Sequence, residues 1–107
     1  MATKMYNTST WRNIRKAYLM ENPECELCSA RGKVTLAEEV HHIDHIADAN
    51  NELDAMDRAF DSGNLMSLCK ACHSRIHAIE RHGALIAEDK EIIEKYNALI
   101  RAKNKHE

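Results

Sequence analysis

Hydrophobic residues recur every three or four positions near both ends of the chain, and this spacing predicts two amphipathic helices. The first helix covers residues 10–21, has Ser9 or Thr10 as its cap and ends at Asn22-Pro23. Its apolar positions are Trp11, Ile14, Tyr18 and Leu19. The second helix covers residues 88–103, and its apolar positions are Ile92, Ile93, Tyr96, Leu99 and Ile100. We expect this second stripe to pack against its own domain, with contact to a partner chain as the alternative.

Two shorter apolar segments between these helices predict a pair of strands. Residues 33–43 form the first strand, in which hydrophobic positions alternate imperfectly, and it ends in His41, His42 and Ile43. Residues 65–68 form the second strand, which we expect to pair back onto the first. The two adjacent histidines therefore stand at the end of a small sheet.

The segments on either side of the second strand differ in character. Residues 44–63 are acidic and polar, which predicts a long loop with a short helical turn around residues 53–60. A loop of this length in a small domain is usually functional or disordered, and we assign it no function. We expect a helix over residues 69–82, which ends at Gly83. Its expected inward positions are Ala71, Ile76 and Ile79.

The chain has 107 residues, a length that predicts a single domain with a core over about residues 22–82 and a helix on either side. Its net charge of −2 hides a segregated pattern. Residues 1–34 carry six basic and three acidic side chains. Residues 35–66 carry one basic and eight acidic side chains, and residues 67–107 carry eight basic and six acidic side chains. The basic ends favour an anionic partner, whereas solvated charged faces are the plainer alternative.

Four cysteines stand in two C-x-x-C pairs, Cys25 with Cys28 and Cys69 with Cys72. Residues 1–20 contain no continuous apolar run, so we expect neither a signal peptide nor a membrane span, and we predict a cytoplasmic protein. In a reducing compartment, paired cysteines bind metal more often than they form disulfides. Two such pairs complete a tetrahedral four-sulfur site for a structural Zn²⁺. Disulfides and a redox pair are the alternatives, but the latter needs a thioredoxin-like context that the pattern lacks.

The histidines predict a second, different metal site. His73 and His77 are four residues apart on a predicted helix, so both imidazoles project from one face and can bind one ion. His41 is the candidate third ligand. His42 should point to the other side of the strand, where its imidazole is suited to take a proton from water near neutral pH. A second closed zinc site or plain surface histidines are the alternatives, and the remaining histidines (His45, His82 and His106) are assigned to the surface or to packing.

Basic side chains on two of the predicted helices are candidates to contact phosphate groups. Arg12, Arg15 and Lys16 fall mostly on the face of the first helix that lies away from its apolar stripe. Lys70 and Arg75 lie on the helix that follows the second cysteine pair. The basic face of the first helix could contact phosphates, but exposed arginines are common on helices, so a solvated surface without function is the alternative.

Taken together, these residues resemble the HNH endonuclease family, specifically its small cysteine-bearing members from phages and bacteria. The matching segments are Trp11-Arg12, Cys25-x-x-Cys28, Val40-His41-His42-Ile43, Asn64-Leu65, Leu68-Cys69-x-x-Cys72-His73 and His77. They span about two-thirds of the chain. The resemblance implies an α+β fold with a ββα-metal (His-Me finger) core, in which a hairpin and a helix hold one catalytic divalent cation against the scissile phosphate.

The same resemblance implies a role for each matching residue. His42 would be the general base that activates water, and Asn64 would hold the hairpin loop so that this base is aimed. His41, His73 and His77 would bind the catalytic ion. Many relatives have aspartate at the position of His41, so this chain resembles the histidine-rich version found in the nuclease domains of bacterial colicins. An all-imidazole shell should favour Ni²⁺, Co²⁺, Zn²⁺ or Mn²⁺ over Mg²⁺.

The expected function is a metal-dependent endonuclease that nicks or cuts double-stranded DNA with low sequence specificity, because the pattern contains no dedicated base-recognition module. We expect a monomer or homodimer, in phage DNA processing or packaging, with terminase or other packaging proteins as partners. One rival is a non-catalytic zinc-ribbon adaptor for DNA or protein, which requires the cysteines and the basic helix but not His42. A metal-dependent hydrolase of another substrate leaves the basic helix unexplained.

Overall fold

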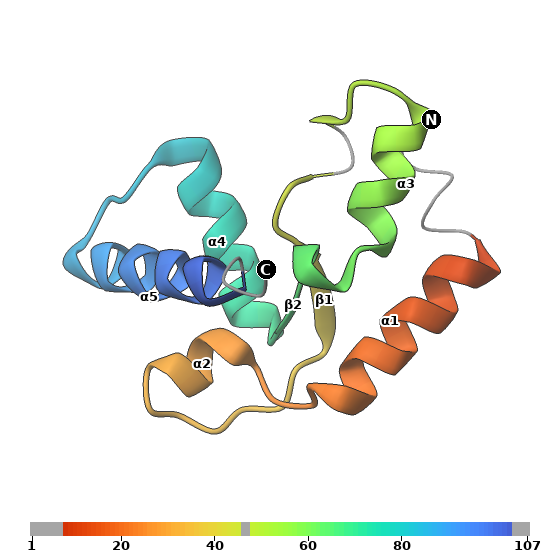
Figure 1. The fold of residues 1–107 in the computed structure, drawn as a ribbon. Helices are drawn as coiled ribbons and strands as arrows, with labels where there is room; N and C mark the ends of the chain where they lie inside the picture. Colours follow the sequence, from red (N-terminus) through yellow and green to blue (C-terminus); the bar gives the residue numbers. More distant parts are fainter. Residues whose placement is uncertain (1–7, 46–47, 104–107) are drawn as a thin grey trace.

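A computed structural model describes residues 8–45 and 48–103 of the chain. Within these ranges a two-stranded antiparallel sheet lies between groups of helices (Figure 1), which confirms the predicted α+β fold. The elements in chain order are α1 (Ser9–Glu21), α2 (Glu26–Ala30), β1 (Glu39–His42), α3 (Glu52–Phe60), a 3-10 turn (Ser62–Asn64), β2 (Leu65–Leu68), α4 (Lys70–His82) and α5 (Ala87–Lys103).

The sheet pairs β1 with β2 in a register that puts Glu39 opposite Leu68 and His42 opposite Leu65. This confirms that residues 65–68 pair back onto the first strand. Because consecutive residues of a strand face opposite sides, His41 and His42 leave β1 in different directions. One strand therefore delivers a histidine to each side of the sheet.

The first strand is much shorter than its predicted range of residues 33–43. Among the described residues, the part of the predicted strand that precedes β1 makes one β-pair, an isolated bridge between Glu24 and Leu36. Val34 and Leu36 are 81% and 70% exposed, so their hydrophobic side chains do not pack on the core. Without burial on one face, nothing extends the ladder toward residue 33.

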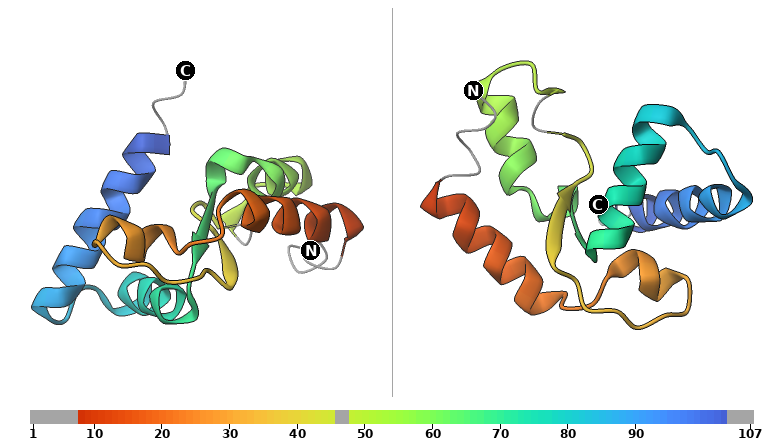
Figure 2. Two further views of the ribbon diagram at one scale, coloured as in Figure 1. Left: turned by 90° about the horizontal axis from the view of Figure 1, so that it is seen from below. Right: turned by 180° about the vertical axis from the view of Figure 1, so that it is seen from behind.

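Helix α1 covers one side of the sheet, and α5 lies on the opposite side (Figure 2). The buried residues under α1 are Trp11, Tyr18, Val40 and Leu65. The cap of this helix differs from the prediction of Ser9 or Thr10. Thr8 is the cap instead, because its backbone is extended and its Oγ1 accepts a hydrogen bond from the N–H of Trp11 at 3.1 Å.

The second and larger core lies where α2, α4 and α5 meet the sheet. Its largest hydrophobic members are Leu27, Met66, Leu68, Ile76, Ile92 and Tyr96. The prediction that the stripe of α5 packs on its own domain is thereby confirmed. Ala71 was expected to face inward but is exposed, because α4 turns Cys72 and Ile76 toward the core instead. Gly83 ends α4 with a positive φ of 77°, a conformation that costs a glycine little.

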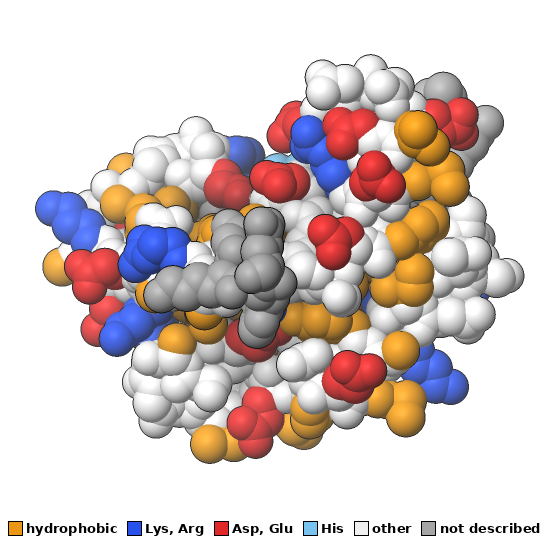
Figure 3. All heavy atoms as spheres, viewed as in Figure 1, with side chains coloured by type: hydrophobic (Ala, Val, Ile, Leu, Met, Phe, Trp, Pro, Cys, Tyr) orange, Lys and Arg blue, Asp and Glu red, His pale blue; other side chains and the backbone are white. Residues whose placement is uncertain are grey.

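The acidic segment of residues 44–63 contains more structure than the predicted loop. Asn51 caps helix α3, because its side chain accepts a hydrogen bond from the N–H of Asp54 at 2.8 Å, and the helix buries Ala55 and Ala59. Its charged side chains point outward, so that acidic groups gather over α3 on the face shown in Figure 3. Within the described residues, no helix is long and apolar enough to cross a membrane.

Candidate active site and metal centres

The four cysteines meet in one buried cluster, as their spacing predicts. Cys25 and Cys69 stand directly before α2 and α4, so each helix carries its second cysteine, Cys28 or Cys72, three residues later. Their four sulfur atoms lie within 4.8 Å of one another, and all four are free thiols rather than disulfides. The Sγ of Cys28 lies 3.6 Å from that of Cys72 and 3.9 Å from that of Cys69.

These distances fit a tetrahedral metal. With Zn–S bonds of about 2.3 Å, tetrahedral geometry places neighbouring sulfur atoms about 3.8 Å apart. Burial raises the pKa of the Cys72 thiol, and its thiol neighbours raise it further. A central dication removes this penalty because it stabilises the thiolate form. The cluster is therefore arranged for a metal ion and has no position left for a substrate.

A second cluster combines a histidine of the sheet with two histidines of a helix. His41 comes from β1, and His73 and His77 come from successive turns of α4. Their candidate ligand atoms also lie within 4.8 Å of one another. The Nε2 atoms of His73 and His77 are 3.0 Å apart, a few tenths of an ångström closer than the separation of about 3.3–3.4 Å between two nitrogens bound tetrahedrally to one ion. The structure therefore brings the three predicted ligands together.

A carboxylate decides which nitrogen of His73 carries its proton. Glu39 accepts a hydrogen bond from Nδ1 of His73. Because a neutral imidazole has one N–H, Nε2 of His73 then holds a lone pair, and this lone pair faces Nε2 of His77. Nδ1 of His77 lies 3.3 Å from Glu80. A lone pair on Nε2 is the form in which His73 can bind a metal ion shared with His77.

His41 is the most buried of the three, with 1% of its surface exposed. Burial, together with the nearby imidazoles of His73 and His77, lowers its pKa to about 3. The hydroxyl of Tyr96 lies 2.8 Å from its Nε2 and fixes the orientation of the ring. A neutral, oriented imidazole is the form of histidine that binds metal ions.

His42 lies on the other side of β1, as predicted for consecutive strand residues. Its ring centroid is 4.6 Å from that of Trp11 in α1. Its Nε2 donates a hydrogen bond to the carbonyl of Ala59 at 3.3 Å, so the lone pair of the neutral ring is on Nδ1. Burial lowers the pKa of His42, which keeps the ring neutral and able to accept a proton.

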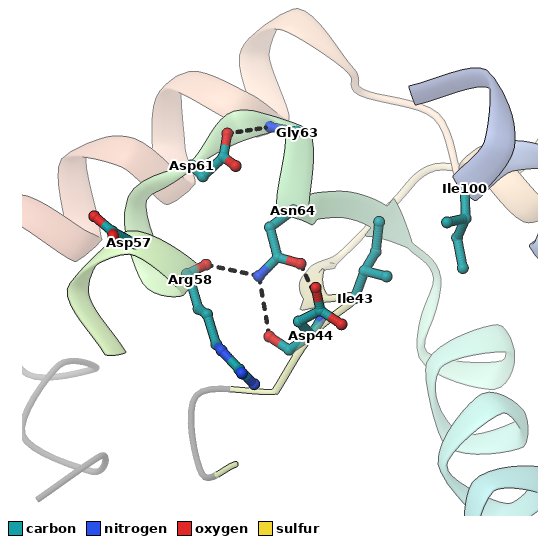
Figure 4. A pocket seen from close by; sticks show the side chains of 8 residues that line it. All are labelled: Ile43, Asp44, Asp57, Arg58, Asp61, Gly63, Asn64 and Ile100. Carbon is teal, nitrogen blue, oxygen red and sulfur yellow. Dashed lines mark hydrogen bonds between the residues drawn. The ribbon is translucent and has the colours of Figure 1, made fainter. Parts of the chain in front are cut away.

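Asn64 ties the two ends of the segment between the strands (Figure 4). Its Oδ1 accepts a hydrogen bond from the N–H of Asp44 at 2.7 Å. Its Nδ2 donates to the carbonyls of Asp44 and Arg58, at 3.0 Å and 2.8 Å. Arg58 directly precedes Ala59, whose carbonyl contacts His42. The asparagine thus fixes the end of α3 against which His42 is oriented.

A family model for the HNH endonuclease matches residues 25–78, which include both cysteine pairs, the paired histidines, Asn64, His73 and His77. The chain belongs to the HNH endonuclease family. Among solved structures it is similar to the HNH endonuclease of the deep-sea thermophilic bacteriophage GVE2, crystallised with a manganese ion. The two share 33% identity with a TM-score of 0.63, and the match covers 75% of this chain and 82% of that one. No curated protein matches the chain.

Membership of this family makes the chain a nuclease, for which DNA is the implied substrate. The five basic candidates of this HNH endonuclease lie in two places. On α1, Arg12 and Lys16 are exposed, and Arg15 donates a hydrogen bond to the carbonyl of Glu38 at 2.9 Å. On α4, Lys70 is exposed at the first position, and Arg75 forms an ion pair with Asp89 at 2.8 Å.

Sequence reasoning missed several partners of the histidine cluster. His45 was assigned to the surface or to packing, yet its ring lies 5.7 Å from that of His41 and 5.5 Å from that of His77. Glu39 had a usable signal, because it lies two residues before His41 and so faces the same side of the strand. Tyr96 had none, since its contact with His41 joins residues 55 apart in the chain. His106 lies outside the described residues.

Proposed function

We propose that this HNH endonuclease hydrolyses phosphodiester bonds of DNA with His42 as general base and with a catalytic dication on His41, His73 and His77. The observation that carries the proposal is the separation of roles along one strand. His41 turns toward two further imidazoles, whereas the adjacent His42 is held neutral against a backbone carbonyl. In the proposed mechanism, a ligand and a base on consecutive residues act on the same phosphate.

In this mechanism Nδ1 of His42 removes a proton from water as the oxygen attacks phosphorus. The hydrogen bond from Nε2 to Ala59 stabilises the imidazolium that results, because the carbonyl faces the ring's other N–H. A bound dication supplies Lewis-acid stabilisation of the phosphoryl oxygen and the leaving oxygen. Asn64 keeps the loop in place, so the base does not need to reorganise during the reaction.

The two metal sites call for different ions. The thiolate cluster suits a structural Zn²⁺, held by Cys25, Cys28, Cys69 and Cys72. For the imidazole cluster we propose one of Mn²⁺, Ni²⁺, Co²⁺ and Zn²⁺ ahead of Mg²⁺, because nitrogen ligands suit transition metals better than Mg²⁺. The manganese ion in the similar phage enzyme supports Mn²⁺ as one candidate.

DNA would be bound through its backbone by Arg12, Arg15, Lys16 and Lys70, with Arg75 contributing less because Asp89 and Glu88 already neutralise it. Phosphate contacts carry no base information, so we propose low sequence specificity. One site cuts one strand per visit, which favours nicking by a monomer, whereas a homodimer would cut both strands. The similarity to a phage enzyme supports a phage context. Within that context we propose a role in phage DNA processing or packaging, in the cytoplasm, with terminase or other packaging proteins as partners.

The test is conversion of supercoiled plasmid by the purified protein with Mg²⁺, Mn²⁺ or Ni²⁺, or with excess chelator. His42→Ala should lower the cleavage rate by about 10²–10⁴-fold, the usual contribution of general-base catalysis. His82→Ala is a matched control, because His82 is an exposed histidine at the end of α4. Circular dichroism and zinc content verify that the variants are folded. Cleavage by folded His42→Ala at the wild-type rate would overturn the assignment of the base, and the absence of metal-dependent cleavage would favour a non-catalytic adaptor.

A further inference from the structure

A second group of metal-binding side chains lies beside the proposed catalytic site. His45, His77 and Glu80 offer two imidazoles and one carboxylate, whose ligand atoms lie within 4.8 Å of one another. His45 follows β1, whereas His77 and Glu80 are three residues apart on α4. Glu80 is exposed and both histidines are partly exposed, so an ion can reach this outer group from solvent.

One carboxylate oxygen is the meeting point of the outer group. Oε1 of Glu80 lies 3.1 Å from Nε2 of His45 and 3.3 Å from Nδ1 of His77. The rings of the two histidines are stacked, with centroids 5.5 Å apart and an interplanar angle of 26°. Two ring nitrogens and a carboxylate oxygen are a donor set that Zn²⁺ and similar transition metals bind, leaving further positions for water.

We propose that His45, His77 and Glu80 form a second, weaker site for a transition-metal dication, and that this outer site competes with the inner cluster for His77. The two sites use opposite nitrogens of the same ring. Nε2 of His77 lies 3.0 Å from Nε2 of His73, and Nδ1 faces Glu80. A neutral imidazole has one proton and one lone pair. When Nδ1 binds the outer ion, the ring proton moves to Nε2, which then has no lone pair for the inner ion.

The competition has a direct consequence for the inner cluster. An ion on the outer group leaves His41 and His73 as the two remaining imidazoles of the inner cluster. Excess metal should therefore slow DNA cleavage, and loss of His45 or Glu80 should relieve that inhibition. This consequence rests on the proposed nuclease mechanism, whereas the outer site itself does not.

The binding test uses the full chain with its structural zinc, titrated with Ni²⁺ by isothermal titration calorimetry, with zinc content measured before and after. Wild type should bind two Ni²⁺ ions in addition to zinc. The first should bind tightly at the inner cluster, and the second should bind more weakly, because it takes His77 and leaves the first ion on His41 and His73. His45→Ala and Glu80→Gln should each lose the weaker ion and change the affinity of the tighter ion by less than about tenfold. His82→Ala, which removes an exposed histidine from the same helix, should keep both.

Two results would overturn the proposal: wild type binding a single Ni²⁺, or both variants retaining the weaker ion. If Glu80 only orients His77 for the inner ion, Glu80→Gln should weaken that ion by about 10–100-fold and His45→Ala should change nothing. A plasmid assay at rising Ni²⁺ completes the test, with inhibition expected in wild type but not in His45→Ala. Absent cleavage in every variant refutes the proposed function, while the calorimetric result still decides the outer site.

Discussion

Substitution of Asn64 tests how the segment between the strands supports the site. The Asn64 side chain makes three hydrogen bonds to backbone groups, all between 2.7 and 3.0 Å. A hydrogen bond of this kind contributes about 1 kcal/mol net to the free energy of unfolding. Removing one of its two groups costs more when the remaining donor or acceptor cannot bind water instead. Asn64→Ala removes the hydrogen-bond partner of the N–H and the carbonyl of Asp44 and of the carbonyl of Arg58. We therefore expect a loss of about 3 kcal/mol in the free energy of unfolding.

The measurement is thermal unfolding at a fixed zinc concentration. For a domain of this size, 1 kcal/mol corresponds to about 4–8 °C, so a loss of about 3 kcal/mol in Asn64→Ala should lower Tm by roughly 12–24 °C. Asn64→Asp keeps an acceptor for Asp44 N–H but places carboxylate oxygens against two carbonyls, and it should be at least as destabilising. Asn97→Ala, at an exposed position of α5, is the control and should stay within about 0.5 kcal/mol of wild type.

A second readout follows from the contact between Ala59 and His42. Loss of Asn64 frees the carbonyl of Arg58, next to the one that orients the base. Cleavage by Asn64→Ala should therefore fall even at temperatures where circular dichroism shows a folded protein. A Tm within about 2 °C of wild type would refute the stability reasoning, because it corresponds to less than about 0.5 kcal/mol. Unchanged cleavage by the folded variant would refute the positioning of His42 through Asn64.

Three further predictions concern the metals and DNA. Cys69→Ser should lose zinc and leave the chain unfolded at 25 °C, because structural zinc sites contribute about 10–16 kcal/mol; metal analysis and circular dichroism measure both effects. Tyr96→Phe removes the hydroxyl beside His41 and should weaken Ni²⁺ binding at the inner cluster by about 10–100-fold in calorimetry, and unchanged affinity would contradict its orienting role. Arg12→Ala and Lys16→Ala should each weaken DNA binding equally for all sequences and lower the slope of log affinity against log salt by about 1, and a sequence-dependent loss would argue against phosphate contacts.

Features that depend on spacing within one or two turns were predictable from the sequence. A C-x-x-C pair brings two sulfurs together whatever surrounds it, and residues four apart on a helix share a face, which explains why Cys25, Cys28, His73 and His77 lie where their spacing places them. Strand length was less predictable, because Val34 and Leu36 have the composition of a strand but find no core to pack on.

Contacts between distant segments that belong to no recognisable motif were not predictable. The contact between His45 and Glu80 joins residues 35 apart, and the ion pair between Glu26 and Lys103 joins residues 77 apart. His45 also follows a turn after β1, so its distance from His41 along the chain says nothing about which ring it meets. Such contacts depend on how the helices cross the sheet, and one sequence does not contain that information.

The short strand β2 limits where insertions and deletions can occur in members of this family. Its four residues join Asn64 directly to Cys69, so no spare residue separates the loop anchor from the sulfur cluster. At about 3.3 Å per residue, the four residues of β2 set the distance between Asn64 and Cys69. A deletion of one residue here would also turn every side chain of the strand to the opposite side of the sheet. Relatives should therefore vary in length within residues 44–63 while keeping the interval from Asn64 to Cys69 constant.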